Sequence, residues 1–157
     1  MRILVTGSSG FIGRFLIPEL IAKGHEVVGL DVRVGPEFGG SFCFIRGNIL
    51  DAGVLGGAMD GIDLVIHLAA EHKDFGVTDG LYHEVNVEGT KNLLRCAAER
   101  AVGKFVFFSS VAVYGSSPIP THEGLECSPE LPYGKSKLLA EHALEEWTQT
   151  DRSRSVV

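Results

Sequence analysis

The chain alternates along its length between short apolar runs and longer segments whose apolar residues recur at helical spacing. The apolar runs predict strands at residues 3–6, 26–31, 42–46, 62–68 and 104–109, and the opening of a sixth strand at 153–157. The helical spacing predicts helices at residues 11–23, 54–59, 81–100 and 133–149. Strands that alternate with helices form right-handed crossovers. We therefore predict an α/β fold, a doubly wound parallel sheet with helices on both faces.

Proline and glycine modify this pattern in three places. Pro18 lies inside the first helical segment and predicts a kink or one loosened turn there. Gly53, Gly56 and Gly57 predict a weak second helix, because glycine disfavours helical backbone. Residues 114–132 contain repeated prolines and glycines, which predicts one long loop.

Length and composition indicate one soluble domain. The chain has 157 residues, of which 45% are hydrophobic and 22% charged, so a disordered chain is excluded. Its 14 basic and 20 acidic residues give a net charge of -6, which argues against nucleic-acid and anionic-membrane binding. Cys43, Cys96 and Cys127 form no CxxC motif, and the sequence shows neither a signal peptide nor an apolar run of membrane length. We expect a cytoplasmic protein.

A glycine-rich turn separates the first predicted strand from the first helix. Gly7, Gly10 and Gly13 allow a tight turn, a close approach of backbone to a pyrophosphate, and close packing of helix on strand. Asp31 falls at the end of the second strand, 18 positions after Gly13, where a carboxylate can bind a ribose. An ordinary turn and a solvated carboxylate are the alternatives. The combination predicts a Rossmann-type dinucleotide site.

Five motifs together resemble the extended short-chain dehydrogenase/reductases. They are the GxxGxxG turn, HLAA at 67–70, NVEGT at 86–90, SSVAVYG at 109–115 and YGKSK at 133–137. Their order and spacing are most similar to those of the NAD-dependent epimerase/dehydratases that act on nucleotide sugars. The resemblance covers essentially the whole chain. It implies NAD as the cofactor and a nucleotide sugar as the substrate.

The resemblance implies a set of residues around the cofactor. Phe11 and Ile12 would contact the pyrophosphate through backbone, and Asn86 would support the active-site lysine through a water. Asn48-Ile49 stands where the family usually has Asp-Ile for the adenine, which keeps an amide but removes a charge. The implied cofactor residues are Gly7, Gly10, Phe11, Ile12, Gly13, Asp31, Arg33, Asn48, Ile49, Leu68, Ala69, Ala70, Asn86, Ser110, Tyr133 and Lys137.

Ser110, Tyr133 and Lys137 match the catalytic residues of the family, and their chemistry fits hydride transfer. A phenol with a pKa near 10 needs about 4 kcal/mol of help to act as a base at pH 7. Lys137 lies four residues after Tyr133 on one helix face, and an ammonium about 4 Å away supplies roughly that amount. Ser110 would hydrogen-bond the reacting oxygen. Without the glycine turn, a helix-start tyrosine and a solvated lysine would be the simpler interpretation.

Two positions bear on the reaction subtype. Nucleotide-sugar dehydratases of the family carry Asp-Glu straight after the catalytic hydroxyl residue, where this chain has Val111-Ala112. Neither side chain transfers protons, so a dehydratase is disfavoured. We expect an epimerase first and an NAD(P)-dependent ketoreductase of the same family second. A non-catalytic dinucleotide-binding sensor or scaffold is the hypothesis from another class.

Charge at the ribose site favours NAD over NADP. A 2′-phosphate beside Asp31 would meet a like charge, which Arg33 is near enough in sequence to soften. No metal site is expected, because His67, His72 and His83 lack ligand spacing and fit strand-end and surface positions. Residues 71–73 and 121–123 are weaker candidates for substrate contact.

The remaining expectations concern assembly. The helices at 81–100 and 133–149 carry apolar residues on more than one face, which predicts a homodimer of helix pairs. Those residues are Leu81, Val85, Leu93, Leu94, Leu138, Leu139, Leu144 and Trp147. Residues 1–157 would form the NAD-binding domain alone, without the smaller C-terminal part that closes over the sugar in this family. We therefore expect weak NAD binding, no turnover, and association through an uncovered sheet edge.

Overall fold

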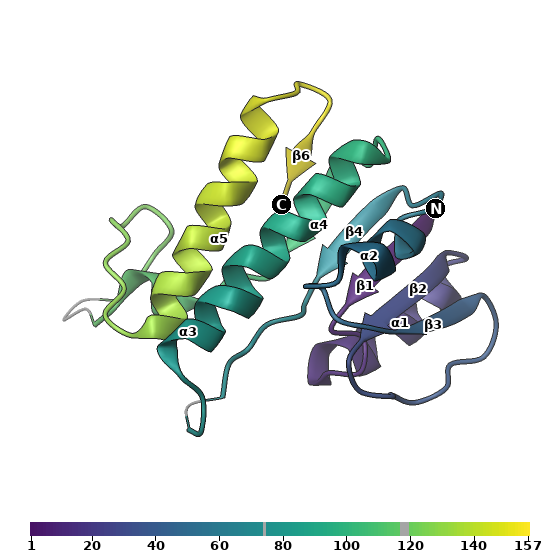
Figure 1. The fold of residues 1–157 in the computed structure, drawn as a ribbon, viewed down its shortest axis with the longest axis horizontal. Helices are drawn as coiled ribbons and strands as arrows, with labels where there is room; N and C mark the ends of the chain where they lie inside the picture. Colours follow the sequence, from purple (N-terminus) through teal and green to yellow (C-terminus); the bar gives the residue numbers. More distant parts are fainter. Residues whose placement is uncertain (74, 117–119) are drawn as a thin grey trace.

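A computed structural model describes residues 1–73, 75–116 and 120–157 and contains one six-stranded sheet (Figure 1). The strands are β1 (Arg2–Thr6), β2 (Glu26–Asp31), β3 (Phe42–Arg46), β4 (Leu64–His67), β5 (Lys104–Phe107) and β6 (Ser155–Val156). All pairs are parallel, in the order β3-β2-β1-β4-β5-β6. The order reverses direction at β1, which confirms the predicted doubly wound sheet.

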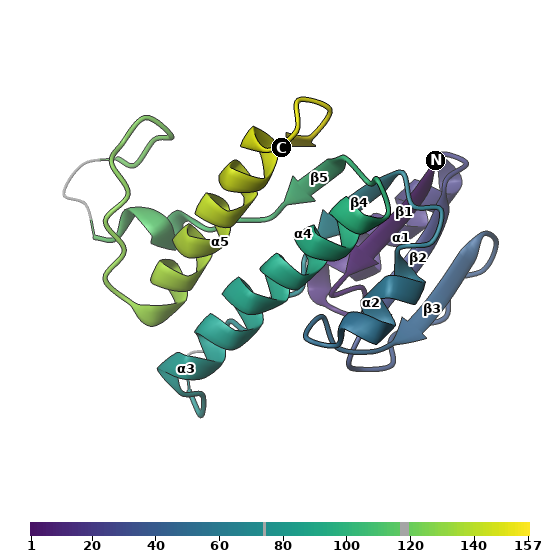
Figure 2. The same ribbon diagram turned by 45° about the horizontal axis from the view of Figure 1, so that its top comes forward.

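Helices cover the two faces of the sheet. They are α1 (Phe11–Ala22), α2 (Ala52–Ala58), α3 (Asp79–Tyr82), the π-helical η1 (His83–Glu88), α4 (Gly89–Glu99), the 3-10 helix η2 (Val111–Tyr114) and α5 (Pro132–Gln149). Helices α4 and α5 run side by side in both ribbon views (Figure 2). Within the described residues, none of the helices combines the length and the apolar character that crossing a membrane requires.

Two apolar cores form because each central strand is buried on both faces. In β1, Ile3 and Val5 pack with Ile17 of α1, whereas Leu4 between them belongs to the core on the opposite face. Successive side chains of a strand point to opposite faces, so a strand covered on both sides is apolar throughout. The core that contains Leu4 also contains Leu93, Leu94, Leu144 and Trp147, four of the eight apolar residues counted on the two long helical segments. These four residues are therefore covered inside the domain, while Leu139 is 45% exposed.

The structure departs from the sequence prediction in the helices. Helix α1 contains Pro18 as expected but ends at Ala22, just before the predicted end; the kink or loosened turn at Pro18 stays a prediction. Helix α2 begins earlier than predicted, at Ala52, because the side chain of Asp51 accepts the N–H groups of Gly53 and Val54. The segment predicted at 81–100 begins at Asp79 and contains the π-helical turn η1, which apolar periodicity does not reveal.

Strand lengths differ from the prediction as well. Strands β4 and β5 are shorter than the predicted runs and end at His67 and Phe107. The predicted sixth strand forms as β6, where Val157 donates its N–H to the carbonyl of Phe105 at 3.0 Å. The predicted loop at 114–132 includes residues 117–119, which lie outside the described part of the chain.

Candidate active site

A groove of about 770 Å³ lies where the strands end, above the point at which the strand order reverses. The turns after β1, β2, β3 and β4 line it together with the start of α5. Of the residues that the resemblance implies, all except Asn86 and Ser110 line this groove. Residues 71–73, which were weaker candidates, line it too. Chain segments far apart in sequence thus meet at the place where doubly wound sheets bind ligands.

The glycine turn is too tight for side chains at two positions. Gly7 has a φ of +69°, and a Cβ there would lie 2.7 Å from the backbone nitrogen of Ala69. A Cβ on Gly13 would lie 2.3 Å from the carbonyl oxygen of Ser8. Gly10 is the N-cap of α1 and offers no side-chain cap, so the first N–H groups of the helix remain available to an anion.

Asp31 is held firmly at the end of β2. Its carboxylate accepts the N–H groups of Ser9 at 3.0 Å and of Arg33 at 2.9 Å, and only 8% of the residue is exposed. The exposed Arg33 guanidinium lies 3.9 Å from the same carboxylate. A carboxylate has about four acceptor positions, so lone pairs remain for ribose hydroxyls. Asp31 is therefore not a freely solvated carboxylate.

Asn48 and Ile49 differ in what they offer the groove. The Asn48 side-chain oxygen accepts the N–H of Leu50 at 3.0 Å, so the amide NH₂ is the donor that an adenine would meet. Ile49 is 5% exposed and belongs to the larger core. In the turn after β3, the Asn48 side chain therefore bonds the backbone of Leu50, while Ile49 packs into the core.

Lys137 is a buried lysine on the groove side of α5. It is 3% exposed; its Nζ donates to the carbonyl oxygen of Phe108 at 2.7 Å and lies 4.0 Å from the centre of the Phe107 ring. Burial lowers the pKa of Lys137 to about 8, and the carboxylate of Glu141 opposes that change. Tyr133 also lines the groove, one helical turn earlier. The structure therefore brings these two residues to one side of α5, as their spacing predicts.

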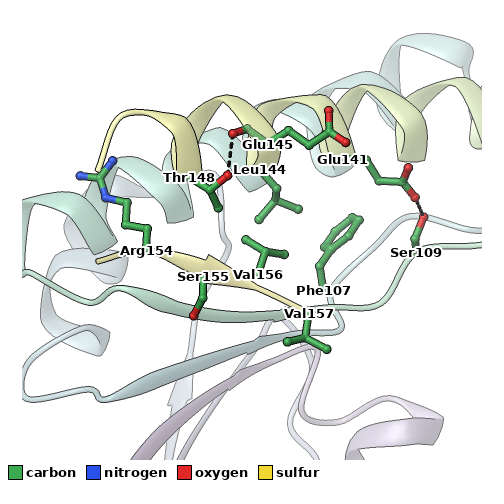
Figure 3. Close-up of a pocket in the computed structure, with 10 residues that line it drawn as sticks. All are labelled: Phe107, Ser109, Glu141, Leu144, Glu145, Thr148, Arg154, Ser155, Val156 and Val157. Carbon is green, nitrogen blue, oxygen red and sulfur yellow. Dashed lines mark hydrogen bonds between the residues drawn. The ribbon is translucent and has the colours of Figure 1, made fainter. Parts of the chain in front are cut away.

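The two serines after β5 have different surroundings. Ser110 is half-buried and caps η2 by accepting the N–H of Ala112 at 3.2 Å. Ser109 lines both the groove and a smaller hollow of about 560 Å³ between α5 and β6. Figure 3 shows the Ser109 hydroxyl directed at Glu141, to which it donates a hydrogen bond.

Asn86 lies beneath the groove rather than on it. It is 2% exposed; its side-chain oxygen accepts the N–H of Glu71 at 2.8 Å, and its amide nitrogen donates to the Glu71 carbonyl at 3.0 Å. The same nitrogen donates to the Ser136 hydroxyl at 2.9 Å, which donates to the Tyr133 carbonyl at 2.7 Å. Ser136 was not among the predicted site residues, and its place in the YGKSK motif was its one sequence signal.

Comparison with known proteins decides the family. The model of the NAD dependent epimerase/dehydratase family matches residues 3–157. The chain belongs to this family. The resemblance drawn from the five motifs is thereby confirmed.

Relatives in the family are identical to this chain at more than a third of the aligned positions. An N-acetyl-alpha-D-glucosaminyl-diphospho-ditrans,octacis-undecaprenol 4-epimerase of Escherichia coli O157:H7 is 37% identical, over 99% of this chain and 47% of the relative. A dTDP-glucose 4,6-dehydratase of an Actinoplanes species is 36% identical, over 87% of this chain and 49% of the relative. This chain therefore spans about half the length of these curated relatives.

A solved structure of the family has the same fold. The UDP-glucuronic acid 4-epimerase of Bacillus cereus, in complex with UDP-glucuronic acid and NAD, superposes with a TM-score of 0.89 at 32% identity. The match covers 100% of this chain and 55% of the epimerase. The NAD-bound neighbour and the NAD dependence of the family agree with the cofactor predicted from the sequence.

His67 is the histidine of the HLAA motif and lies at the end of β4, a strand-end position as the sequence predicts. It is 1% exposed, whereas His72 and His83 are exposed. Burial, with a further contribution from the positive charge of Lys137, lowers the pKa of His67 to about 3. Among the described residues, no group of histidine, cysteine or acidic side chains could hold a metal ion.

We expect His67 to make the stability of this domain sensitive to acid. The unfolded chain takes up a proton near pH 6.5 that folded His67 refuses until about pH 3. The free energy of unfolding therefore falls as the pH drops through this window, by about 3 kcal/mol between pH 6.5 and 4. Urea titrations at several pH values should show this slope in the wild type and its loss in His67→Gln. The exposed His142→Gln should keep it; an unchanged slope in His67→Gln would contradict the assignment.

Proposed function

We propose that residues 1–157 form the NAD-binding domain of a nucleotide-sugar epimerase. The observation that carries the proposal is the groove itself, which joins the glycine turn and Asp31 to Tyr133 and Lys137. The glycine turn and Asp31 suit a dinucleotide, and Tyr133 and Lys137 suit proton transfer at a carbinol. The 4-epimerase among the relatives, whose sugar is linked to diphospho-undecaprenol, supports the reaction type. The epimerase structure bound to UDP-glucuronic acid supports the nucleotide-sugar substrate class.

The residues of the groove fit NAD. Gly10 and the N-terminus of α1 would hold the pyrophosphate, and Asp31 would accept the ribose hydroxyls. When bound, NAD supplies a reversible acceptor for the hydride of the substrate carbinol. Lys137 would place its ammonium near the nicotinamide ribose and the phenol of Tyr133.

Tyr133 would act as the base that takes the proton of the substrate hydroxyl. Lys137 favours the ionised phenol through its positive charge, which its lowered pKa of about 8 still allows at neutral pH. Ser110 would hold the same hydroxyl by a hydrogen bond and orient it toward Tyr133. In an epimerase the resulting ketone then accepts hydride on its other face, and Tyr133 returns the proton.

The positions after Ser110 favour epimerisation over dehydration. Val111 is 80% exposed at the start of η2 and, like Ala112, carries no group that transfers protons. The complete gene product that carries these residues should be incubated with UDP-glucose, UDP-glucuronic acid and dTDP-glucose and followed by NMR. We expect inversion of one sugar carbon. Loss of water from the sugar, net consumption of NADH, or NAD binding without any conversion would each overturn the epimerase proposal.

We expect the chain to bind NAD more tightly than NADP. The Asp31 carboxylate, fixed by two backbone N–H groups, would bind two ribose hydroxyls but repel a 2′-phosphate. Calorimetric titration with both nucleotides should give an affinity for NAD at least about tenfold higher, the factor of one charge-assisted hydrogen bond. Asp31→Asn should reduce this ratio. Equal or tighter NADP binding by the wild type would contradict the assignment.

The neighbouring serines provide a matched pair. Ser110→Ala should lower the turnover of the complete gene product by about ten- to a hundredfold, because the reacting oxygen loses an orienting hydrogen bond. Ser109→Ala removes a hydroxyl that is bonded to Glu141 and should change turnover less than about threefold. Steady-state kinetics of both variants check this. The reverse order of effects would move the catalytic role to Ser109.

The same proposal includes a location and an assembly. The cysteines Cys43, Cys96 and Cys127 are all free, which suits a reducing cytoplasm. A homodimer remains a prediction. It now rests on Leu139 and the half-buried Leu81 and Leu138, since the other apolar residues of both helices pack inside the domain or lie partly covered.

A further inference from the structure

A buried chain of hydrogen bonds runs beneath the groove from the turn after β4 to the first turn of α5. At its centre lies His67, whose Nδ1 is 2.7 Å from the Thr6 hydroxyl and whose Nε2 is 3.0 Å from the Thr90 hydroxyl. Thr6 and Thr90 are fully buried. The three side chains come from β1, β4 and α4, so the link joins three elements of the fold.

The partners of the two threonines determine where the protons lie. The Thr90 hydroxyl donates its single proton to the carbonyl oxygen of Asn86 at 2.7 Å, so it can only accept from His67. His67 therefore carries a proton on Nε2. The Thr6 hydroxyl accepts the N–H of Ala69 at 3.3 Å and donates its proton to Nδ1. A second ring proton on Nδ1 would leave the Thr6 hydroxyl proton without this acceptor.

The neutral form of His67 also suits its neighbour. The ring of Phe107 lies 5.7 Å from the ring of His67, and the same ring lies 4.0 Å from the Nζ of Lys137. An imidazolium would thus add a second buried positive charge close to the ammonium. Like charges in a buried site repel strongly, so a protonated His67 would disfavour the charged form of Lys137.

The link continues from Thr90 to α5. Asn86, whose carbonyl accepts from Thr90, uses its side chain to hold the backbone of Glu71 and the hydroxyl of Ser136. Ser136 in turn donates to the carbonyl of Tyr133. The π-helical turn η1 contains Asn86, which is buried where it reaches both partners. The hydrogen bonds therefore lead from Ala69, on the groove, to the backbone of Tyr133.

We propose that His67 and Thr90 are positioning residues, which hold the turn after β4 and the Tyr133 turn of α5 in register through one neutral, Nε2-protonated imidazole. This proposal rests on the proposed function, because the alignment of the two turns affects a reaction only if Tyr133 acts in this site. Neither residue touches the groove. Their effect on the reaction is exerted through Ala69, Asn86 and Ser136.

The first experiment reads the tautomer directly. Nitrogen-15 NMR of the histidine rings of the 157-residue chain distinguishes a protonated ring nitrogen from an unprotonated one. We expect one histidine to stay neutral with a proton on Nε2 from pH 8 down to pH 5, and His67→Gln to remove its signals. A charged ring at pH 5, or a proton on Nδ1, would overturn the proposal whether or not the protein has any enzymatic activity.

The second experiment separates positioning from stability. Thr90→Val keeps the shape of the side chain but removes both hydrogen bonds, whereas Thr90→Ser retains the hydroxyl. Thr148→Val is the control, because Thr148 also bonds a helix carbonyl but lies in α5 away from this link. All variants are studied well below their melting temperatures, with NAD affinity measured on the chain and kcat and KM on the complete gene product.

We expect Thr90→Val to weaken NAD binding about fivefold and to lower kcat about tenfold with KM for the sugar nearly unchanged. Thr90→Ser and Thr148→Val should stay within about twofold of the wild type. If Thr90→Val only lowers the melting temperature, with NAD affinity and kcat intact, the role is structural and the proposal is wrong. A wild type that binds NAD but converts no nucleotide sugar would instead overturn the proposed function, and the NAD affinities would still test this inference.

Discussion

Replacement of Tyr133 by phenylalanine should remove nearly all turnover and leave NAD affinity within a few-fold of the wild type. The change deletes the one oxygen proposed to take the substrate proton, and general acid–base groups contribute about a hundred- to ten-thousandfold to rate. The phenyl ring keeps the shape of the side chain and its contact with Tyr82, whose ring centre lies 6.2 Å away. Steady-state assays of the complete gene product with nucleotide sugars, beside NAD titrations of the same variant, measure both quantities.

The pair of measurements makes this prediction specific. A parallel fall in NAD affinity would indicate that the variant had disturbed the start of α5 rather than the chemistry. Substantial turnover in Tyr133→Phe, with NAD bound normally, would show that Tyr133 is not the base. The wild type provides the reference for both values under identical conditions.

A methyl group at Gly13 should abolish useful NAD binding. In Gly13→Ala the new Cβ would lie 2.3 Å from the Ser8 carbonyl oxygen and 2.8 Å from its carbon, so the turn must move. That movement displaces the backbone N–H groups that would bind the pyrophosphate. Loss of two charge-assisted hydrogen bonds corresponds to an affinity at least about a hundredfold lower. Overpacking should also lower the free energy of unfolding by about 1–3 kcal/mol.

Gly57 offers a matched control for the same substitution. It lies near the end of α2, and, apart from its chain neighbours and the backbone of its own helix, no atom of the described residues lies within 4 Å of the position that a Cβ would take. Gly57→Ala should leave NAD affinity unchanged and stabilise the helix by up to about 1 kcal/mol. Calorimetry and thermal unfolding of both variants test the contrast. Normal NAD binding by Gly13→Ala would mean that the glycine turn does not hold the cofactor.

Local patterns were enough to predict the architecture. Apolar runs and helical spacing identified the strands and helices, since both depend on residues only a few positions apart. Their alternation implied the parallel sheet, and the glycine turn together with Asp31 indicated a dinucleotide site. The four-residue spacing of Tyr133 and Lys137 placed both on one side of α5, where the groove contains them.

The sequence did not reveal the features that depend on contacts between residues distant in the chain. His67 lies in an apolar run and carries no sign that Thr6, 61 residues away, would bury and bond it. Four apolar residues of the last helices, Leu93, Leu94, Leu144 and Trp147, have partners inside the domain, and a helical pattern cannot distinguish such residues from those of a dimer interface. The π-helical turn at η1 was invisible for a related reason, because it alters the register of a helix without changing its composition.

The sequence by itself thus determined the fold class, the family and the residue types that meet at the groove, because these follow from short-range spacing and motif order. Only the tertiary structure decided the state of those residues. It buried Lys137 against Phe107 and the Phe108 carbonyl, and it joined Asn86 to Ser136 across 50 positions of chain. Burial and hydrogen bonding depend on which strands become neighbours, and these two properties set pKa values and proton positions at the site.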